Sequence, residues 1–468
     1  MAEHFDAILR NGRLVDPRNG IEAVMDVAVK DGRIARIEPT ISGSAMLEHD
    51  LTGKVVMPGI VDMHVHLSPW LGGAFGHRML ALAGVTTALD MAGPIEGVVD
   101  IAASHGAGLS IACINYVRSG HTVGSSDPGA AELRDTLAAS MAQGAIGLKL
   151  LGGHFPLTQQ ASASTIAAAA ERGAYVAFHA GTIETPAPSI ATMVEACELA
   201  AGHPLHLAHI NSYARGFVKP AIQEGVEAVE VLARHPAIWS ESYLAPFNGV
   251  SAKCANGVPE SLATRRGVQV GGFEPTEAGV AQSIEAGWTH IHKAIDGVIV
   301  LVTGAEGLAA WKDAQTNIGA SFMVNPPEPR IHLVTAKKAD GGFAVDALAT
   351  DGGGIPRNDI VQRGLPLVRM SALTLAEFAC KASLMPARAL GLADKGHLAP
   401  GADADITVLD MDRLEPVLVY ANGCRIMENG RTFPGRNRFV TPPEGVAAVE
   451  AAGLEAIVVE PGTMLPPH

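Results

Sequence analysis

The stretch Val61-Asp62-Met63-His64-Val65-His66-Leu67 carries two histidines one residue apart within an apolar run. Side chains two positions apart on a strand point to the same side, so His64 and His66 project together. A pair of neutral imidazoles can form half of a metal site. Pro58-Gly59 stands before the run and predicts a turn that leads into this strand. Two strand histidines also occur for structural reasons alone, so other polar residues must decide between the two interpretations.

Polar side chains also stand at or near the ends of later apolar runs. Lys149 lies in such a run, and His179 and His209 each end one. These three residues follow one another at intervals of about thirty residues, which is the length of one strand-and-helix unit. Asp351 ends a further short run after a longer interval. The spacing indicates neighbouring parallel strands whose side chains are in matching register.

A chain of this kind is expected to fold as a (β/α)8 barrel of the α/β class. In that fold the carboxyl ends of the strands meet at one mouth, where the chemistry takes place. A single buried histidine is usually a satisfied core residue, whereas polar groups at successive strand ends are hard to obtain by chance. We predict that these residues meet at the mouth: His64, His66, Lys149, His179, His209 and Asp351.

Several further stretches resemble the amidohydrolase superfamily of metal-dependent hydrolases. Residues 5–16 and 27–34 resemble its first hairpins. Residues 386–392 are similar to its last barrel helix, and 395–405 to its return into a small β domain. The resemblance covers most of the chain. It implies a (β/α)8 TIM barrel with a small β-sandwich domain built from both chain ends.

The chain divides accordingly. Residues 1–57 alternate apolar and polar positions between Gly-containing turns, which predicts hairpins of the small β domain. The barrel is expected over 58–398, with 245–340 as an inserted lid or subdomain, because this segment is too long for a structureless loop. Residues 399–438 return to hairpin patterning and are expected to complete the small domain. The tail, 439–468, is expected to pack on a neighbouring subunit.

The resemblance implies two divalent metal ions, for which we expect zinc. Such ions provide a metal-bridged hydroxide at neutral pH and polarise the carbonyl of an amide. The more buried ion is expected on His64, His66 and Asp351, and the more exposed ion on His179 and His209.

Lys149 has a special part in this expectation. A free ammonium cannot bind a cation, so a lysine beside two metal ions is unfavourable. The resemblance implies that Lys149 is carboxylated and that its carbamate bridges the ions. The alternative is an ordinary lysine whose stem packs in the barrel and whose amine contacts Asp351.

Asp351 is the expected catalytic residue that accepts a proton from water and passes it to the leaving nitrogen. Alternatively, it is a turn aspartate before three glycines. His154 follows Lys149 by five residues, where related cyclic-amide hydrolases use a tyrosine to polarise the carbonyl. It is therefore a second catalytic candidate, or else a loop histidine without a task. His206 is out of phase with His209 and is expected to point toward the helices.

Two arginines are candidates for binding a substrate carboxylate, because each follows a metal-bearing strand by six residues. They are Arg215 and Arg357, and a guanidinium binds a carboxylate through two parallel hydrogen bonds. Either could instead be an ordinary surface arginine. Residues 241–246 loosely resemble the seventh-strand signature of D-aminoacylases, which makes Tyr243 a further substrate-binding candidate.

The second strand departs from that D-aminoacylase pattern. Those relatives often bridge their metals with a cysteine near this strand, but this chain has Leu89-Asp90-Met91-Ala92 there. The nearest cysteine, Cys113, belongs to the third strand. The departure favours the lysine-bridged group, which includes isoaspartyl dipeptidase, hydantoinase and dihydroorotase.

The expected function is hydrolysis of a C–N amide bond in a small substrate, an N-acyl amino acid or a dipeptide-like amide. One alternative is a cyclic amide or ureide hydrolase, similar to hydantoinase or dihydroorotase. Another is a mononuclear deaminase on the same fold, which Thr182 disfavours because many such enzymes carry glutamate at that position. The third alternative is a non-enzymatic scaffold protein on the same fold. Such a protein would be expected to have lost metal ligands.

Composition is typical of a globular enzyme. The chain has 468 residues, 48% apolar residues, 52 glycines and a net charge of −14 without a basic cluster. These values argue against nucleic acid or an anionic membrane as a partner and leave a small molecule. Five scattered cysteines without a Cys-x-x-Cys motif favour a reduced, cytoplasmic protein. No signal core or membrane-spanning run is apparent, and we expect a homo-oligomer.

Overall fold

The structure is a computed structural model, and it describes residues 3–468. Its centre is a sheet that runs in the order β19-β12-β11-β10-β9-β8-β7-β6-β20. The bounds are β6 Ile60–His66, β7 Val85–Asp90, β8 Ser110–Val117, β9 Gly147–Leu151, β10 Tyr175–His179, β11 Leu205–Leu207, β12 Ile238–Ser242, β19 Ala347–Leu348 and β20 Gly352–Gly353.

Residues 347–353 act as the eighth strand and close this sheet. The strand β19 pairs with β12, while β20 pairs with β6, and both pairings are parallel. The sheet thus returns to its first strand, and the predicted (β/α)8 barrel is confirmed. Its strands are buried on both faces, which explains why they read as continuous apolar runs instead of alternating ones.

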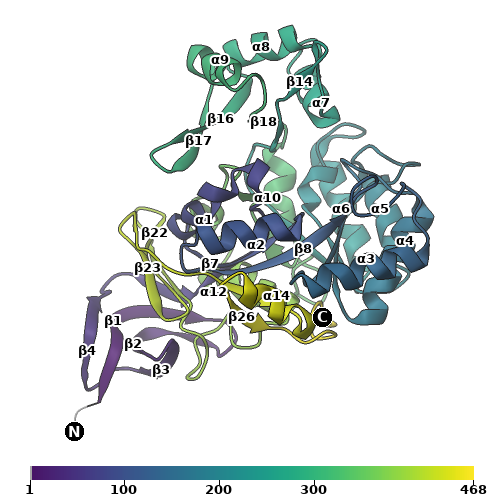
Figure 1. Cartoon of the computed structure of the whole chain (residues 1–468). Helices are drawn as coiled ribbons and strands as arrows, with labels where there is room; N and C mark the ends of the chain where they lie inside the picture. Colours follow the sequence, from purple (N-terminus) through teal and green to yellow (C-terminus); the bar gives the residue numbers. More distant parts are fainter. Residues whose placement is uncertain (1–2) are drawn as a thin grey trace.

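Helices follow the strands and cover the barrel (Figure 1). Their bounds are α1 Gly73–Leu82, α2 Ile95–Ser104, α3 Ala130–Ala142, α4 Gln159–Arg172, α5 Ile190–Leu199, α6 Ala221–Arg234, α10 Pro327–Thr335, α11 Ile360–Arg369, α12 Leu375–Ala379 and α13 Met385–Ala389. Local signals set their limits: for α4, the Thr158 side chain accepts a hydrogen bond from Ala161 N, and Gly173 ends the helix at φ +65°. In α6 the buried Ala228, Val231 and Leu232 share one face, which packs into the barrel core.

A second sheet combines both ends of the chain, as expected for the small β domain. Its N-terminal strands are β1 His4–Asp16, β2 Ile21–Lys30, β3 Arg33–Glu38, β4 Ser44–Asp50 and β5 Val55–Pro58, and its later strands are β21 Ile406–Asp410, β22 Glu415–Ala421, β23 Cys424–Glu428 and β24 Arg431–Thr432. The antiparallel pair β5–β21 joins the two ends. Asp31 and Gly32 both have positive φ in the β2–β3 hairpin, so the Asp-Gly signal corresponds to a tight turn.

The segment between β12 and β19 contains a folded subdomain that stands over the barrel (Figure 1). Its elements are β13 Val250–Ser251, β14 Cys254–Ala255, β15 Val258–Pro259, α7 Leu262–Val270, α8 Glu277–Glu285, β16 Thr289–Ile295, β17 Val298–Val302, α9 Gly304–Asp313 and β18 Gly319–Phe322. It has its own apolar core around Trp311 and Phe322. The helix α10, at the end of the predicted insertion 245–340, packs instead on α6 of the barrel.

The tail packs on the barrel of its own chain. Its strand β25 (Arg438–Thr441) pairs with Ser110–Ala112 of β8 and with β26 (Glu455–Val458). Between them lies α14 (Val446–Ala451). The strand β9 pairs with β8 only from Ile114 onward. The first half of β8 therefore has an edge that β9 does not cover, and β25 pairs with it. These contacts lie within one chain, and the packing of the tail on a neighbouring subunit stays a prediction. Within residues 3–468, no helix has the length and apolar character needed to cross a membrane.

Candidate functional site

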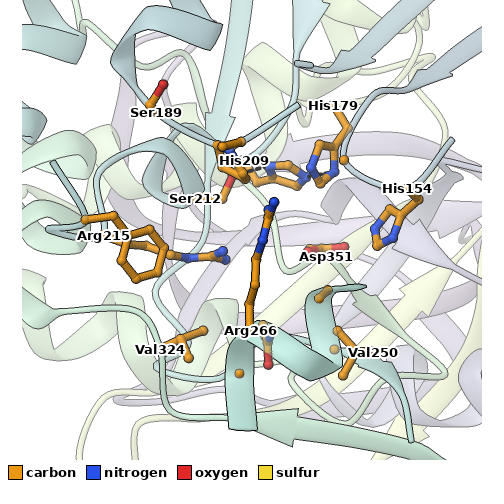
Figure 2. Close-up of a pocket in the computed structure, with 18 of the residues that line it drawn as sticks. His154, His179, Ser189, His209, Ser212, Arg215, Val250, Arg266, Val324 and Asp351 are labelled. Atoms are coloured by element: carbon orange, nitrogen blue, oxygen red, sulfur yellow. Dashed lines mark hydrogen bonds between the residues drawn. The ribbon is translucent and has the colours of Figure 1, made fainter. Parts of the chain in front are cut away.

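The predicted metal ligands lie around one cavity of about 640 Å³ at the mouth of the barrel. Figure 2 shows His154, His179, His209 and Asp351 around this space. The strands β6, β9 and β10 carry four of the predicted positions, and the loops after β11 and β19 carry the other two. The cavity is lined by all six predicted ligands and by three further candidates: His64, His66, Lys149, His179, His209, Asp351, His154, Arg215 and Tyr243.

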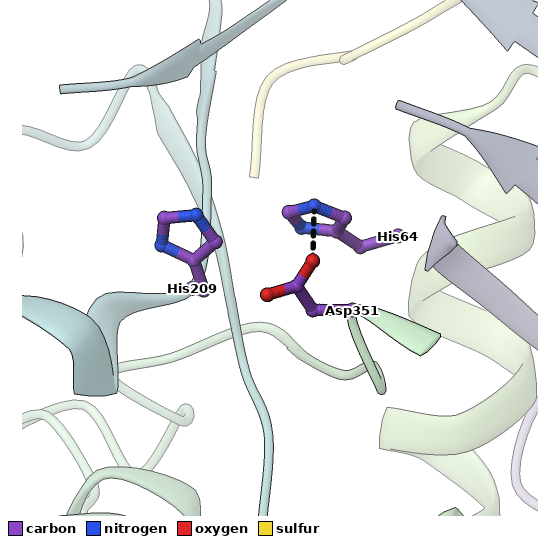
Figure 3. A group of neighbouring side chains, drawn as sticks. All are labelled: His64, His209 and Asp351. Atoms are coloured by element: carbon purple, nitrogen blue, oxygen red, sulfur yellow. Dashed lines mark ion pairs between the residues drawn. The ribbon is translucent and has the colours of Figure 1, made fainter. Parts of the chain in front are cut away.

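Imidazole nitrogens and one carboxylate converge in this cavity. His66 Nε2 is 2.8 Å and His64 Nε2 is 3.3 Å from Asp351 Oδ1. His209 Nε2 is 3.0 Å from His179 Nδ1. Donor atoms of His64, His209 and Asp351 lie within 4.8 Å of one another (Figure 3). These three residues form one candidate metal-binding group, with His66 and His179 beside it.

Three of these histidines, His64, His179 and His209, are held in the neutral form that metal binding needs. Burial lowers the pKa of His64 and His179 well below the ordinary value, and it lowers the pKa of His209 to about 3. Each ring therefore keeps a free lone pair at neutral pH. Burial opposes the ionisation of Asp351, but the Arg357 cation outweighs it and holds the pKa of Asp351 well below the usual range.

Glu241 orients the ring of His64 and holds the main chain of His209, a role that was not predicted from the sequence. This fully buried side chain lies on β12, where Oε1 is 2.6 Å from His64 Nδ1 and accepts a hydrogen bond of 2.7 Å from His209 N. Ser212 Oγ is 2.7 Å from His209 Nδ1. With Nδ1 engaged, the Nε2 atoms of both rings turn toward the cavity. The signal available in the sequence was an acidic residue in an otherwise buried strand.

Two of the candidate ligands have left-handed backbone conformations. His209 has φ +38° and Asp351 has φ +53°, which non-glycine residues rarely adopt. Hydrogen bonds hold both in place, since His209 N donates to Glu241 and Asp351 N donates to His64 O at 2.8 Å. Asp62 adds a further link, because its carboxylate binds the Thr350 hydroxyl beside Asp351. These bonds fix strand 8 against strand 1.

Lys149 is an almost unpartnered buried amine. Its side chain is 1% exposed, and burial lowers its pKa. Within residues 3–468 it forms no ion pair, and its Nζ donates one hydrogen bond, to Met91 Sδ at 3.6 Å. A thioether is a weak acceptor, so the amine is poorly satisfied. The contact with Asp351 that the alternative interpretation requires is not formed.

The acidic residue on the second strand is occupied elsewhere. Asp90 accepts hydrogen bonds from the main-chain N–H of Leu67 and Gly93, both at 2.6 Å. Cys113 Sγ lies 3.7 Å from the same carboxylate, outside the cavity. Neither side chain is therefore in a position to bridge metal ions at the mouth.

His154 faces the cavity, and His206 does not. The His154 ring centroid is 5.3 Å from that of His179, and burial lowers its pKa. The preceding Gly153 passes so close that an added Cβ would lie 2.0 Å from His179 Nε2. His206 is fully buried, with Nδ1 2.7 Å from the Tyr175 hydroxyl and Nε2 3.8 Å from Glu241. It lies inside the barrel below the mouth, so its expected orientation toward the helices is wrong.

The Arg357 guanidinium binds Asp351 and does not point into the cavity. One terminal nitrogen forms an ion pair with the Asp351 carboxylate, and Nε donates to Asp351 O at 2.7 Å. The other terminal nitrogen donates to Phe247 O at 2.8 Å, and the guanidinium lies 4.7 Å from the Tyr243 ring centre. Arg357 is 5% exposed and does not line the cavity. This placement argues against the carboxylate-binding role predicted for it.

Arg215 and Tyr243 do line the cavity. Arg215 Nε donates to Asn325 Oδ1 at 2.8 Å, and a terminal nitrogen lies 3.4 Å from the Tyr243 hydroxyl. That hydroxyl also receives a hydrogen bond of 3.2 Å from Asn325. Figure 2 shows the Arg215 side chain pointing into the same space as the histidines.

Comparison with known proteins establishes the family. Residues 55–430 match the model of the amidohydrolase family, so the chain belongs to this family. A dihydroorotase from Pelotomaculum thermopropionicum is 25% identical over 92% of this chain and 94% of its own length. An allantoinase from Solibacter usitatus is 28% identical, with 92% and 91% covered.

A solved structure has the same two-domain fold. The N-acyl-D-glutamate deacylase from Bordetella bronchiseptica, in complex with zinc and a phosphonate inhibitor, superposes with a TM-score of 0.67. The similarity covers 93% of this chain and 99% of that one at 16% identity. The family, together with these relatives, identifies the protein as a hydrolytic enzyme that acts on C–N bonds. The scaffold alternative is thereby set aside.

Proposed function

We propose that the protein hydrolyses the amide bond of a small carboxylated substrate, an N-acyl amino acid or a dipeptide-like amide. In this reaction water adds its oxygen to the carbonyl carbon, the C–N bond breaks, and a carboxylate and an amine are released. The observation that supports it most directly is the position of the cationic Arg215 in the cavity that holds the predicted metal ligands. A guanidinium there provides a partner for a carboxylate close to the reacting bond.

The donor set fits two divalent metal ions. Neutral buried imidazoles and an ionised carboxylate are ligands that zinc accepts, and zinc is present in the Bordetella deacylase structure. His64, His66 and Asp351 would hold one ion and His179 and His209 the other. When bound, the ions would supply a nucleophile at neutral pH and polarise the carbonyl.

We propose that Lys149 is carboxylated. In this reaction Nζ forms a bond to the carbon of carbon dioxide and loses a proton, which leaves an anionic carbamate. The step requires an unprotonated amine, and the burial of Lys149, which lowers its pKa, favours that form. The anion also removes the electrostatic conflict between an ammonium and metal ions.

Asp351 is the proposed proton carrier, from water to the leaving nitrogen. Its Oδ1 faces His64 and His66, while Arg357 holds the other oxygen. The ion pair favours the ionised carboxylate, so the protonated form would be a strong acid. This property suits delivery of the proton to an amine nitrogen. Arg357 is accordingly proposed to position Asp351.

The cyclic-amide alternative has specific support. The relatives named dihydroorotase and allantoinase match most of this chain. His154 stands in the cavity beside His179, where it could help to polarise a carbonyl. A mononuclear deaminase has less support, because the Thr182 hydroxyl is engaged with Glu195 at 3.0 Å. The five free cysteines support the expected cytoplasmic location.

A metal analysis combined with a substrate panel tests the proposal. The zinc-loaded protein should contain about two ions per chain. N-acyl amino acids should be hydrolysed with a higher kcat/KM than hydantoins or cyclic imides. Hydrolysis of the cyclic compounds alone would establish the alternative. One ion per chain together with release of ammonia would indicate the deaminase.

A further inference from the structure

The inserted subdomain forms one wall of the cavity. The barrel supplies the predicted metal ligands, and the helix α7 of the subdomain faces them across the cavity. Positions 263, 266, 267 and 270 of α7 follow helical spacing and share one face. That face is the one that lines the cavity: Ala263, Arg266, Gly267 and Val270, with Gln269 beside it. The binding site is therefore incomplete without the subdomain.

Arg266 brings an uncompensated positive charge into this cavity. Figure 2 shows its side chain extended from α7 toward His209 and Asp351. Within residues 3–468 its guanidinium has no hydrogen bond and no ion pair. The neighbouring Arg265 differs, because its Nε donates to Pro259 O at 2.6 Å and it lies outside the cavity.

The charges around the cavity favour an anionic ligand. Arg215 and Arg266 both line it, and Asp351 is the carboxylate among the described lining residues. Asp351 is already paired with Arg357. Five donors of a planar guanidinium remain available on Arg266, a geometry that matches a carboxylate.

An apolar rim lies beside these arginines. Phe217, Val218 and Val270 line the same cavity and are 55%, 73% and 48% exposed. Val324 and Ala263 line the same cavity. Exposed apolar side chains that adjoin a binding cavity favour a ligand that covers them. The continuity of rim and cavity indicates that one ligand occupies both.

We propose that α7 selects substrates that carry a carboxylate and an apolar acyl group. Arg266 binds the carboxylate, and the rim of Phe217, Val218 and Val270 holds the acyl chain, with the scissile amide between them at the barrel mouth. The inference rests on the proposed function and names its substrate class: N-acyl amino acids with an aliphatic or aromatic acyl group.

Kinetics with paired substrates test whether Arg266 binds the negative charge of the substrate. N-octanoylalanine carries a carboxylate where its counterpart carries a neutral carboxamide of nearly the same shape. Arg266→Gln should lower kcat/KM for the acid by roughly ten- to two-hundred-fold and change that for the carboxamide by less than about threefold. Arg265→Gln is the matched control and should leave both substrates within about twofold of the parent. Equal losses on both substrates would overturn the proposal.

Binding measurements separate this proposal from the reaction itself. The probe is an analogue of N-octanoylalanine in which a methylene replaces the amide nitrogen, titrated into the metal-loaded protein by calorimetry. The parent should bind the acid more tightly than its carboxamide, and Arg266→Gln should reduce that preference by roughly tenfold or more, leaving the part that Arg215 contributes. If no amide is hydrolysed but the preference is lost in the variant, the specificity stands and the proposed reaction fails. A preference that the substitution leaves unchanged in size overturns the specificity whatever the reaction.

The dependence of binding affinity on the length of the acyl chain tests whether the rim holds that chain. Lengthening the acyl chain by one methylene should strengthen binding by about twofold to fourfold while the chain lies on the rim. Val218→Ser should flatten this dependence without altering the preference for the acid. A parent protein whose affinity does not change with chain length would contradict the assignment of the rim.

Discussion

The amine of Lys149 is buried, and its only hydrogen-bond partner among the described residues is a thioether. If its carbamate bridges the metals, Lys149→Ala should lower the metal content and the turnover together. Short-chain carboxylic acids such as propionate should restore part of the activity, because they can supply the missing carboxylate. Metal analysis and kinetics check this outcome. A variant that keeps two ions and full activity would show that Lys149 does not bridge.

Asp351→Asn retains a carbonyl oxygen for ligation but cannot carry a proton. Turnover should fall by about 10²–10⁴-fold, the range typical of lost acid–base catalysis. Metal content, measured in the same preparation, should change much less. Turnover within a few-fold of the parent would restrict Asp351 to ligation.

Arg357→Met removes the cation that keeps the pKa of Asp351 low. That pKa should rise, so the acidic limb of the pH dependence of kcat/KM should move to higher pH. Because Arg357 does not line the cavity, carboxylated and neutral substrates should lose activity equally. Arg215→Gln is the comparison, since that arginine does face the cavity. A selective loss on carboxylated substrates in Arg357→Met would return Arg357 to a substrate-binding role.

The set of residues at the mouth could be predicted from the sequence, because strand ends in a parallel barrel share one edge. The partners of those residues could not. Glu241 reads as one acidic residue in a buried strand, and only the barrel closure brings it to His64 and His209. The position of Arg357 depends on the left-handed turn at Asp351, which the sequence does not specify.

The loop after β9 is shaped by close contact with His179. Gly153→Ala would place a methyl group 2.0 Å from His179 Nε2, so the ring must move. We expect the variant to lose about one metal ion per chain and to keep most of its thermal stability. Gly129→Ala is the matched control, since nothing lies within 4 Å of its added Cβ and its φ is −72°. An unchanged metal content in Gly153→Ala would exclude His179 as a ligand.

Elements with strong local signals could be predicted well. The Asp-Gly turn between β2 and β3 is an example, because both residues adopt the positive φ that such hairpins need. The eighth strand is divided between β19 and β20, each two residues long, and only its pairing identifies it. The subdomain strands β13, β14 and β15 are also two residues long, and likewise only their pairing identifies them.

Stability of the whole molecule should depend on pH through buried histidines outside the site. Burial lowers the pKa of His77 from its ordinary 6.5 to about 3, and His77 Nδ1 lies 2.9 Å from Asn437 Nδ2. The unfolded chain therefore binds a proton below about pH 6.5 that the folded chain resists. The free energy of unfolding should fall as the pH drops from 6.5 toward 3, by up to ~1.4 kcal/mol per pH unit from this residue.

Urea unfolding at pH 7 and pH 4.5 measures this effect. His77→Gln cannot take up the proton, so its stability should decline less between the two pH values than that of the parent. Equal declines in both proteins would assign the pH dependence to other groups. The homo-oligomer expected from the sequence stays a prediction, which sedimentation can examine in the same buffers.

The pairing of β25 with β8 has a consequence for how the protein is made. Ser110 belongs to the early part of the chain and Arg438 to its late part, yet they are partners in one sheet. During synthesis, this edge of β8 stays unpaired until the whole barrel, most of the small domain and β25 have been synthesised. A nascent or shortened chain therefore presents an open strand edge, which is a template for aggregation. A chain without the tail is therefore expected to depend on chaperones and to give a poor yield.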